Sequence, residues 1–283
     1  MKTLLLFNTQ AGKGKIDHRI EDIEALFRSD GFDFKSKHLV FAENPFDGEE
    51  ETELAVICGG DGTINYVVNM MRERGLNPTL GIIPSGTAND FAGAIGMQSN
   101  HIKAAQQIAR GSERQVDCGW VNGKYFVNVF SFGVFTTTSQ HTSDKAKHHI
   151  GKLAYIGVGI KDLLSIHRIG LHITHDDTVL DCEALMLLAF NGETAGRFPL
   201  AREAKVDDGL LDVLILERRN FFATCANMVR YLCGGHPRAI RHLRCSKLHI
   251  EASCDEPTDV DGQAGPEFPI TIRCEAGALR VRC

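Results

Sequence analysis

Hydrophobic residues in the first third of the chain follow two alternating periods. Short apolar runs at residues 3–7, 54–58 and 80–83 have the length and composition of buried strands, and residues 32–41 can supply another strand. Between the runs, apolar residues recur at helical spacing in two stretches: Ile16, Ile20, Ile23 and Phe27, then Ile64, Val67, Val68 and Met71. Strands alternating with helices predict a Rossmann-like, three-layer α/β domain around a largely parallel sheet.

Beyond about residue 116 the pattern is dominated by strands. Trp120-Val-Asn-Gly-Lys-Tyr125 predicts a hairpin, because Asn-Gly favours a tight turn between two strands. Further strands are predicted at residues 171–174, 179–190, 210–216, 248–252 and 270–273, and helices at residues 151–166 and 221–232. We interpret the apolar stripe of the second helix as core: Phe221, Phe222, Met228 and Leu232. The predicted fold class is α/β plus β: an α/β domain at residues 1–118, a β-rich sandwich domain at 119–283, and an interdomain cleft.

The clearest chemical signal is a glycine-rich turn that follows the strand at residues 54–58. Gly59-Gly60-Asp61-Gly62-Thr63 lies between this strand and a predicted helix. Glycines let the backbone approach a bulky anion, and N–H groups at a helix start favour negative charge. Asp61 suits such a loop if it holds Mg²⁺ or accepts a proton from an attacking hydroxyl. The alternative is a tight strand-to-helix turn that binds nothing.

A second loop has the same construction. The strand ending at Pro84 is followed by Ser85-Gly86-Thr87-Ala88-Asn89-Asp90 and another helix start at Phe91. By itself, Asn89 or Asp90 is equally well explained as a helix cap or as a ligand-binding residue. Two such loops at one edge of a parallel sheet face the same crevice, where open α/β sheets bind ligands.

Composition narrows the class of protein. The formal net charge is −5 without a long basic run, which argues against a nucleic-acid partner. No apolar run approaches the length of a membrane-spanning helix, and the run at residues 4–7 is too short for a signal peptide. Nine cysteines without a Cys-x-x-Cys pair indicate scattered buried thiols rather than disulfides or a zinc site. We therefore expect a cytoplasmic protein.

The motifs in this order resemble those of one family. Asn8 with its Gly/Lys-rich loop, residues 59–63 and Gly86-Thr-Ala-Asn-Asp-Phe91 are similar to the three nucleotide-site motifs of the diacylglycerol kinase catalytic domain. This family includes soluble bacterial lipid kinases and is related to sphingosine kinases. The similarity continues at residues 116–126, 204–213 and 261–262, so it extends over essentially the whole chain.

The resemblance implies a kinase that uses ATP and Mg²⁺ to phosphorylate a lipid hydroxyl. It places Asp61 in the Mg²⁺ and catalytic network, and it places Asp261 and Gln263 at the positions of a further catalytic motif. The implied nucleotide site consists of Asn8, Gly59, Gly60, Asp61, Gly62, Thr63, Ile64, Asn65, Gly86 and Thr87. A second Mg²⁺ would be held by the Asp208 carboxylate and the carbonyls of Lys205 and Leu210. Without the resemblance, the run 207–209 indicates only a turn.

The chain departs from the family pattern at three places. The family commonly has Asp-Gly-Glu near the end, with the Glu assigned to catalysis, where this chain has Asp261-Gly262-Gln263. Glutamine cannot act as a general base, so either Asp61 and Asp261 suffice, Glu267 substitutes, or activity is low. Tyr66 stands where a Glu often follows Asn65, and Thr9-Gln10 replaces a run that usually contains proline.

Three functions remain open at this point: a lipid kinase, a kinase for a soluble molecule similar to NAD kinases, and a catalytically impaired lipid- or nucleotide-binding regulator. For the first, the partners are a lipid alcohol and a membrane surface contacted peripherally. A candidate contact is Lys145, Lys147, His148, His149 and Lys152 beside Leu153, Tyr155 and Ile156, which equally describes an ordinary amphipathic helix packed on the β-rich domain. An exposed sheet edge can support a homodimer.

Overall fold

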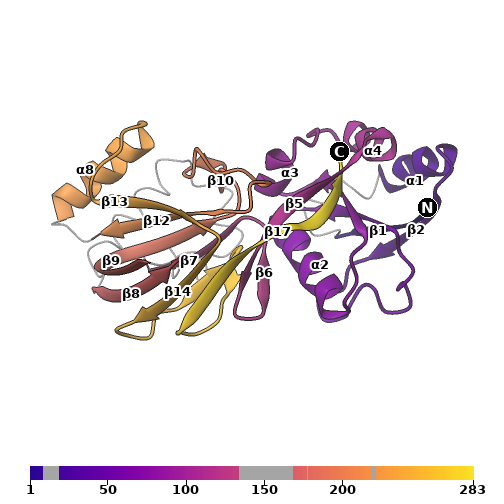
Figure 1. Cartoon of the computed structure of the whole chain (residues 1–283). Helices are drawn as coiled ribbons and strands as arrows, with labels where there is room; N and C mark the ends of the chain where they lie inside the picture. The colour runs from indigo at the N-terminus through magenta and orange to yellow at the C-terminus, as the bar shows by residue number, and fades with distance from the viewer. Residues whose placement is uncertain (9–18, 134–167, 177, 218–220) are drawn as a thin grey trace. The chain divides into compact units, whose positions relative to one another are not determined.

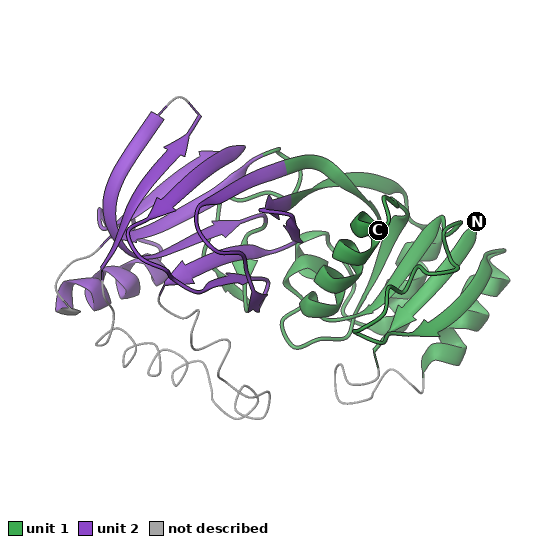
Figure 2. Cartoon of the chain, turned by 90° about the horizontal axis from the view of Figure 1, so that it is seen from below, with its two compact units in different colours: residues 1–118, 192–209, 275–283 green, residues 119–191, 210–274 purple. Residues whose placement is uncertain are grey.

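The computed structural model describes residues 1–8, 19–133, 168–176, 178–217 and 221–283. The chain divides into two compact units, coloured separately in Figure 2. Unit 1 consists of residues 1–118, 192–209 and 275–283, and unit 2 consists of residues 119–191 and 210–274. Unit 1 is therefore assembled from three stretches of sequence, two of which lie far beyond residue 118.

Unit 1 contains a parallel sheet with helices on both faces (Figure 1). The strands are β1 (Lys2–Phe7), β2 (Asp33–His38), β3 (Leu54–Gly59) and β4 (Thr79–Pro84), in the order β2-β1-β3-β4. The last part of β17 (Ile270–Arg282) extends this sheet through a parallel pair of Val281 with Leu80. The helices are α1 (Ile20–Ser29), α2 (Asp61–Glu73), α3 (Asp90–Ala94) and α4 (His101–Arg110). A short hairpin, β10 (Thr194–Ala195) and β11 (Phe198–Pro199), completes the unit.

Burial explains why β3 and β4 occupy the middle of this sheet. All six residues of each strand are buried, as expected for parallel strands covered on both faces. On one face, Val56 packs against Phe27 of α1 and Ile108 of α4 in a single hydrophobic cluster. On the other face, α2 packs along β3. The three-layer α/β prediction is confirmed.

Unit 2 is built mainly from antiparallel strands. A hairpin of β5 (Glu113–Val121) and β6 (Lys124–Phe126) turns at Asn122 and Gly123, whose φ values of 39° and 93° confirm the predicted Asn-Gly turn. The main path is β16 (Gln263–Ala264), β15 (Thr258–Val260), β7 (Val129–Gly133), β9 (Thr178–Phe190), β8 (Ile169–His175), β14 (Lys247–Ala252) and β17. β12 (Leu211–Glu217) joins β9 to β13 (Ile240–Cys245), and α8 (Phe221–Leu232) follows β12.

The core of unit 2 comes from alternate residues of these strands. Phe130 and Phe132 of β7, Leu187 of β9 and Val213 of β12 share one buried cluster. The β-rich prediction for this part of the chain is confirmed. Two predicted features, the helix at residues 151–166 and the basic segment at 145–156, lie outside the described residues.

One packing prediction is wrong. We interpreted the apolar stripe of α8 as core, but Phe222 is 83% exposed and Leu232 is 39% exposed. Met228 packs partly against the buried pair Leu185 and Leu216, and nothing is assigned to the side chain of Phe221, which lies outside the described side chains. The amount of apolar surface in α8 exceeds what a single face packed on a sheet can cover.

The cysteines are all free. Cys58, Cys118 and Cys245 are buried, Cys233 is exposed, and the remaining five are half-buried. None of the helices in the described ranges combines the length and apolar character needed to cross a bilayer.

Candidate active site

The ends of three neighbouring strands bring the first predicted motifs together. β1 pairs with β3 and β3 with β4, all in parallel, so Asn8, Gly60 and Ser85 follow their strands at the same edge of the sheet. The amide of Ser85 donates to the carbonyl of Gly59 at 2.9 Å, which joins the two glycine loops where they leave the sheet. The carboxyl edge of a parallel sheet is where α/β folds bind ligands.

The two loops touch through their glycines. A Cβ atom built on Gly86 would lie 2.4 Å from Cα of Gly60, and one built on Gly60 would lie 2.9 Å from Cα of Gly86. Both distances are below any normal contact with a Cβ atom, and the obstructing atoms belong to backbone. These glycines are therefore required because two loop backbones meet, which the sequence pattern alone could not distinguish from a need to approach a ligand.

Gly86→Ala is expected to lower the kcat/KM of the kinase reaction that the family resemblance implies at least about tenfold. It should also reduce the free energy of unfolding by about 1–3 kcal/mol. The added methyl group forces the loops apart at the sheet edge. The matched control is Gly93→Ala in α3, where a Cβ meets nothing within 4 Å and helix propensity improves. Steady-state kinetics and thermal unfolding of both variants check the prediction, which fails if the two variants behave alike.

Asp61 connects the first loop to the helix that follows the second. It is the first residue of α2, after Gly60, whose extended backbone begins the helix. Its Oδ1 accepts the amide of Phe91 at 3.0 Å. One carboxylate oxygen thereby orients the side chain at the sheet edge, beside the amides that begin α2, where the helix dipole favours anions.

Asn89 shapes the second loop from within. It adopts a left-handed backbone with φ of 57°, which asparagine tolerates better than most residues. Its Oδ1 accepts the amide of Gly86 at 2.8 Å and its Nδ2 donates to the carbonyl of Gly86 at 3.0 Å. Of the two alternatives considered for Asn89, a side-chain helix cap is not observed, because the side chain makes no cap hydrogen bond and closes the loop on Gly86; binding of a ligand stays a prediction.

The thiol of Cys58 lies just before the first loop and is chemically quiet. Burial raises its pKa to about 12, an effect only partly offset by the hydrogen bond with Ser85. At neutral pH it therefore remains a neutral thiol rather than a nucleophile.

The remaining predicted nucleotide-site residues differ in how exposed they are. Gly62 and Thr87 are exposed and Gly60 is half-buried, whereas Thr63, Ile64 and Asn65 are each at most 5% exposed. The amides of Thr63 and Ile64 both donate to the carbonyl of Gly60, at 2.9 and 3.0 Å. The Asn65 side chain accepts from Asn69 at 3.2 Å. The structure brings these residues to one place in unit 1, and their contacts with nucleotide stay a prediction.

Two buried aspartates have structural roles that the sequence did not reveal. Asp90 accepts from the Thr194 hydroxyl at 2.8 Å and from the amides of Gly196 and Arg197 at 2.6 and 2.9 Å. Asp117 accepts from the amides of Gly209 and Gly277, both at 2.7 Å. Each carboxylate thus holds segments 92 to 160 residues away in sequence, and both belong to motifs quoted for the family resemblance. Position within a motif was the only available signal.

The loop proposed for a second Mg²⁺ follows Val206, whose carbonyl accepts the amide of Asp117 at 2.6 Å. Lys205 is exposed and Asp208 is half-buried, both in the stretch of unit 1 that ends at Gly209, and Leu210 begins the next stretch of unit 2. Among described residues no group of three or more His, Cys, Asp or Glu is placed to hold a metal. A site with one carboxylate and two carbonyls is of a different kind and stays a prediction.

In unit 2, Asp261 is a backbone anchor. It sits at the turn of the β15–β16 hairpin with φ of 51°. Its Oδ2 accepts the amide of Val127 at 2.7 Å, and its Oδ1 accepts those of Asn128 and Val129 at 3.0 and 2.8 Å. From the other side, Asn191 donates to the carbonyls of Asn128 and Val127. This geometry makes Asp261 a positioning residue for 127–129; a direct catalytic role stays a prediction.

Gln263 is exposed and pairs with Val260 just beyond this turn. Glu267, the substitute considered for its missing carboxylate, is also exposed. Position 263 is thus carried by a hairpin that Asp261 fixes to residues 127–129.

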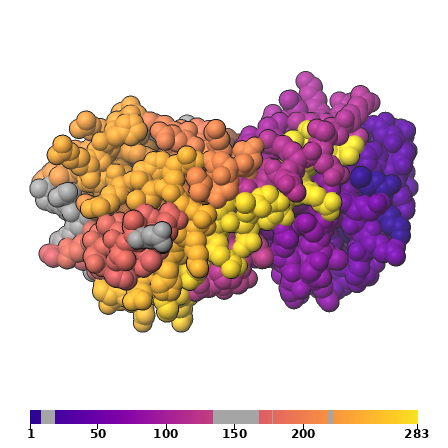
Figure 3. All heavy atoms as spheres, viewed as in Figure 1, coloured from indigo at the N-terminus to yellow at the C-terminus, as the bar shows by residue number. Residues whose placement is uncertain are grey.

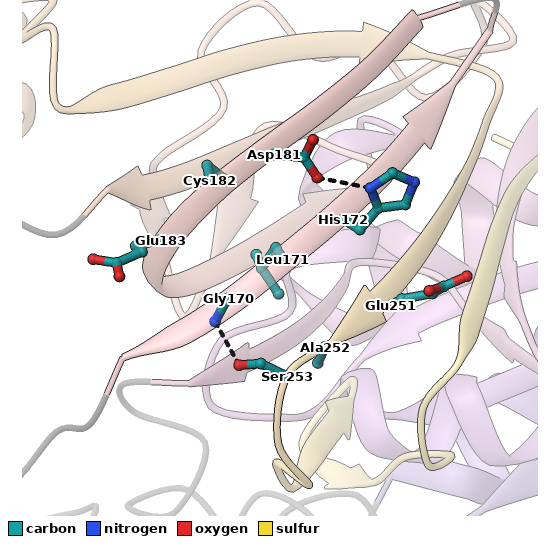
Figure 4. Close-up of a pocket in the computed structure, with 9 residues that line it drawn as sticks. All are labelled: Gly170, Leu171, His172, Asp181, Cys182, Glu183, Glu251, Ala252 and Ser253. Carbon is teal, nitrogen blue, oxygen red and sulfur yellow. Dashed lines mark hydrogen bonds and ion pairs between the residues drawn. The ribbon is translucent and has the colours of Figure 1, made fainter.

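A separate depression lies on unit 2 and is lined by residues of β8, β9 and the end of β14 (Figure 4). His172 and Asp181, which are cross-strand neighbours in its lining, are hydrogen-bonded at 2.7 Å, and the amide of Gly170 donates to Ser253 at 2.9 Å. None of the predicted site residues lines it. Its other carboxylates, Glu183 and Glu251, face Arg168 and His249 outside the lining, so we assign the depression no function.

Comparison with known proteins decides the family. The model of the diacylglycerol kinase catalytic domain matches residues 2–121, and that of the YegS C-terminal NAD kinase beta sandwich-like domain matches residues 128–283. A diacylglycerol kinase of Staphylococcus epidermidis is 34% identical over 226 residues, which cover 78% of this chain and 71% of that protein. The chain belongs to the diacylglycerol kinase family. Because the chain carries the catalytic domain of this family, it is an ATP-dependent lipid kinase.

Other members of the family align with this chain over almost its full length. The diacylglycerol kinase of Bacillus subtilis is 30% identical over 276 residues, covering 94% of this chain and 90% of that protein. A solved diacylglycerol kinase from Bacillus anthracis matches with a TM-score of 0.77 at 26% identity, covering 99% of this chain and 96% of the other. A second Bacillus anthracis structure gives a TM-score of 0.83 at 27% identity with the same coverage. Both predicted domain folds are thereby confirmed.

Proposed function

We propose that this family member transfers the γ-phosphate of ATP, as its Mg²⁺ complex, to the free hydroxyl of diacylglycerol. The observation that carries the proposal is the contact of Gly60 with Gly86 beside Asp61 at the carboxyl edge of the sheet. The acceptor is inferred from the relatives, which are named diacylglycerol kinases. Their kinase activity also argues against the regulator considered from the sequence, and an acceptor hydroxyl on a lipid is preferred to NAD because the loop at residues 86–91 follows the lipid-kinase pattern.

The residues fit Mg-ATP by their chemistry. Exposed Gly62 at the start of α2 suits phosphate oxygens, and the Asp61 carboxylate suits a hard cation. Bound Mg-ATP supplies the transferable phosphoryl group and divalent charge. Within the protein, the loops of Gly59–Thr63 and Gly86–Thr87 would hold the phosphates in line, with Asn8 at their border. Asp208, with the carbonyls of Lys205 and Leu210, would hold a second Mg²⁺ that stabilises its loop.

In this scheme catalysis consists mainly of positioning and charge stabilisation. The Phe91 amide orients the Asp61 carboxylate at the sheet edge. Because this carboxylate is negatively charged, it stabilises the phosphates only by holding a cation. The exposed side-chain amide of Gln263 can donate or accept a hydrogen bond, but it takes no proton from the acceptor hydroxyl. The proton then leaves to solvent or to Asp61.

The test is transfer of radiolabelled γ-phosphate from ATP into a mixed lipid extract in detergent, followed by identification of the labelled lipid. Labelled phosphatidate that disappears on chelation of divalent cations and returns with added Mg²⁺ supports the proposal. Label in another lipid corrects the acceptor, and label only in added NAD overturns the lipid assignment.

Gln263→Glu is expected to raise kcat about tenfold or more, because the carboxylate restores a general base at this position. The exposed site tolerates the change without loss of stability. Gln106→Glu on α4 adds the same charge at another exposed glutamine and is the control. Rates measured from pH 5 to 9 should show a new ionisation only for Gln263→Glu; equal rates for wild type and Gln263→Glu would contradict a base at this position.

A further inference from the structure

Helix α8 turns apolar residues outward from unit 2. Its inner face is buried, since Thr224 is 1% exposed and Met228 packs against Leu185 and Leu216. On its outer face Phe222 is 83% exposed and Val229 is 58% exposed. Figure 1 shows the helix at the margin of the sheet next to β12 and β13, and Figure 3 shows its orange atoms at the surface in the same view.

The outward residues form one continuous stripe. Phe222, Ala226 and Val229 are all exposed and are spaced by four and three residues, so they project from one side of the helix, and exposed Cys233 follows in the turn directly after it. A helix on a water-exposed surface normally presents charged residues there, yet Arg230 is the single charged residue of α8. Of the seven large hydrophobic residues that are strongly exposed in the described ranges, three lie on this helix: Phe222, Val229 and Leu232.

The surroundings of the stripe are basic. From residue 221 to residue 250 the sequence contains five Lys or Arg and no Asp or Glu, although the chain as a whole has 36 acidic residues. Arg241 and Arg244 are paired with Glu217 and Asp212 of β12. Arg230 and Arg238 are exposed, and between described residues neither forms an ion pair. Within the described residues, both side chains are therefore exposed cations.

We propose that α8 docks on an anionic lipid bilayer, with Phe222 and Val229 entering the headgroup region and Arg230 and Arg238 contacting anionic headgroups. An exposed apolar stripe with flanking cations is the pattern of helices that lie in a membrane interface. The inference deepens the proposed function, because an enzyme acting on diacylglycerol must reach a substrate that resides in the bilayer.

Charge selects the bilayer over a second copy of the chain. A two-fold symmetric contact through α8 would bring Arg230 and Arg238 of both copies into one interface, to which residues 221–250 contribute no acidic side chain. A bilayer containing anionic lipid offers both the apolar phase and the opposite charge.

The test is co-sedimentation of the full chain, without ATP, with vesicles of phosphatidylcholine containing about 30% phosphatidylglycerol. We expect binding that weakens about tenfold or more in the double variant Phe222→Ser, Val229→Ser. Arg230→Gln with Arg238→Gln should weaken it on anionic vesicles and leave pure phosphatidylcholine unaffected. Val179→Ser is the matched control, because Val179 is 60% exposed on β9, outside this stripe.

A second measurement covers the case in which the serine variants do not fold. The emission of Phe222→Trp, corrected for Trp120 with the wild-type protein, should shift to shorter wavelength when anionic vesicles are added. Absence of the shift, or a double variant that binds vesicles as the wild type does, overturns the proposal. A double variant that changes only the oligomeric state identifies a contact between copies and also overturns it.

The proposals of membrane docking and of phosphoryl transfer are tested by separate measurements, so either can be overturned without the other. The double variant should phosphorylate a short-chain, water-soluble diacylglycerol at the wild-type rate and lose activity only on diacylglycerol presented in anionic vesicles. If the wild type phosphorylates no lipid but still binds vesicles through α8, the proposed reaction fails and the docking surface stands.

Discussion

Asp61→Asn is expected to lower kcat at least about a thousandfold while leaving the melting temperature almost unchanged. The Asp61 Oδ1 accepts the amide of Phe91 at 3.0 Å, and asparagine carries a carbonyl oxygen in the same position. The hydrogen bond between α2 and α3 is thus retained. What the change removes is the negative charge that holds a cation against phosphate oxygens. Rates of phosphoryl transfer and thermal unfolding of the same preparation check both halves.

The matched control is Asp33→Asn, which removes one negative charge at the exposed start of β2. Its kcat should remain within about twofold of the wild-type value, as for most surface changes. Wild-type turnover in Asp61→Asn would remove Asp61 from the mechanism. Loss of turnover together with a large fall in melting temperature would make Asp61 a structural residue.

Asp261→Ala is expected to lower the free energy of unfolding of unit 2 by about 2–4 kcal/mol. The variant leaves the amides of Val127, Asn128 and Val129 without the carboxylate that accepts them. Asp261→Asn should have a smaller effect, because its carbonyl oxygen keeps the two bonds made by Oδ1. Urea unfolding followed through Trp120, the one tryptophan of the chain, reports on unit 2.

The control for backbone strain is Asp176→Ala. Asp176 also has positive φ, 47°, but its carboxylate faces His175 at 3.8 Å rather than three backbone amides. Both alanine variants bear the cost of a left-handed backbone, so the difference between them isolates the hydrogen bonds. Equal destabilisation would show that the amides of 127–129 gain little from Asp261.

The local elements were predictable because each follows from a short stretch of sequence. The runs at 54–58 and 80–83 are apolar without interruption, and both form strands buried on both faces. Asn122-Gly123 specified its turn through the positive φ that these residues accept. The glycine loops were found for the same reason: Gly60 and Gly86 each follow a recognisable strand.

Long-range connections were not predictable from periodicity. Val281 returns to pair with Leu80, and Asp117 holds Gly209 and Gly277, but neither contact leaves a repeating pattern in the sequence. The reason for Gly86 is likewise the proximity of Gly60, which only the folded sheet creates. A carboxylate that binds backbone amides looks the same in sequence as one that binds a cation.

Helix α8, whose packing was predicted wrongly, shows a different limit of prediction from sequence. The stripe in α8 has the spacing of a core helix, and Met228 does pack inward. Phe222 and Val229 extend the apolar surface around the helix to a side that the sheet does not cover. Hydrophobic periodicity indicates that a face seeks an apolar environment and does not specify whether protein or lipid provides it.

Phosphoryl transfer from ATP to diacylglycerol is tested by mass spectrometry of the product formed in mixed micelles with Mg²⁺, using Asp61→Asn as the blank and NAD as a parallel acceptor. We expect phosphatidate with the wild-type protein, none above background with Asp61→Asn, and no phosphorylated NAD. Phosphorylated NAD without phosphatidate, or equal phosphatidate from both proteins, would contradict this expectation.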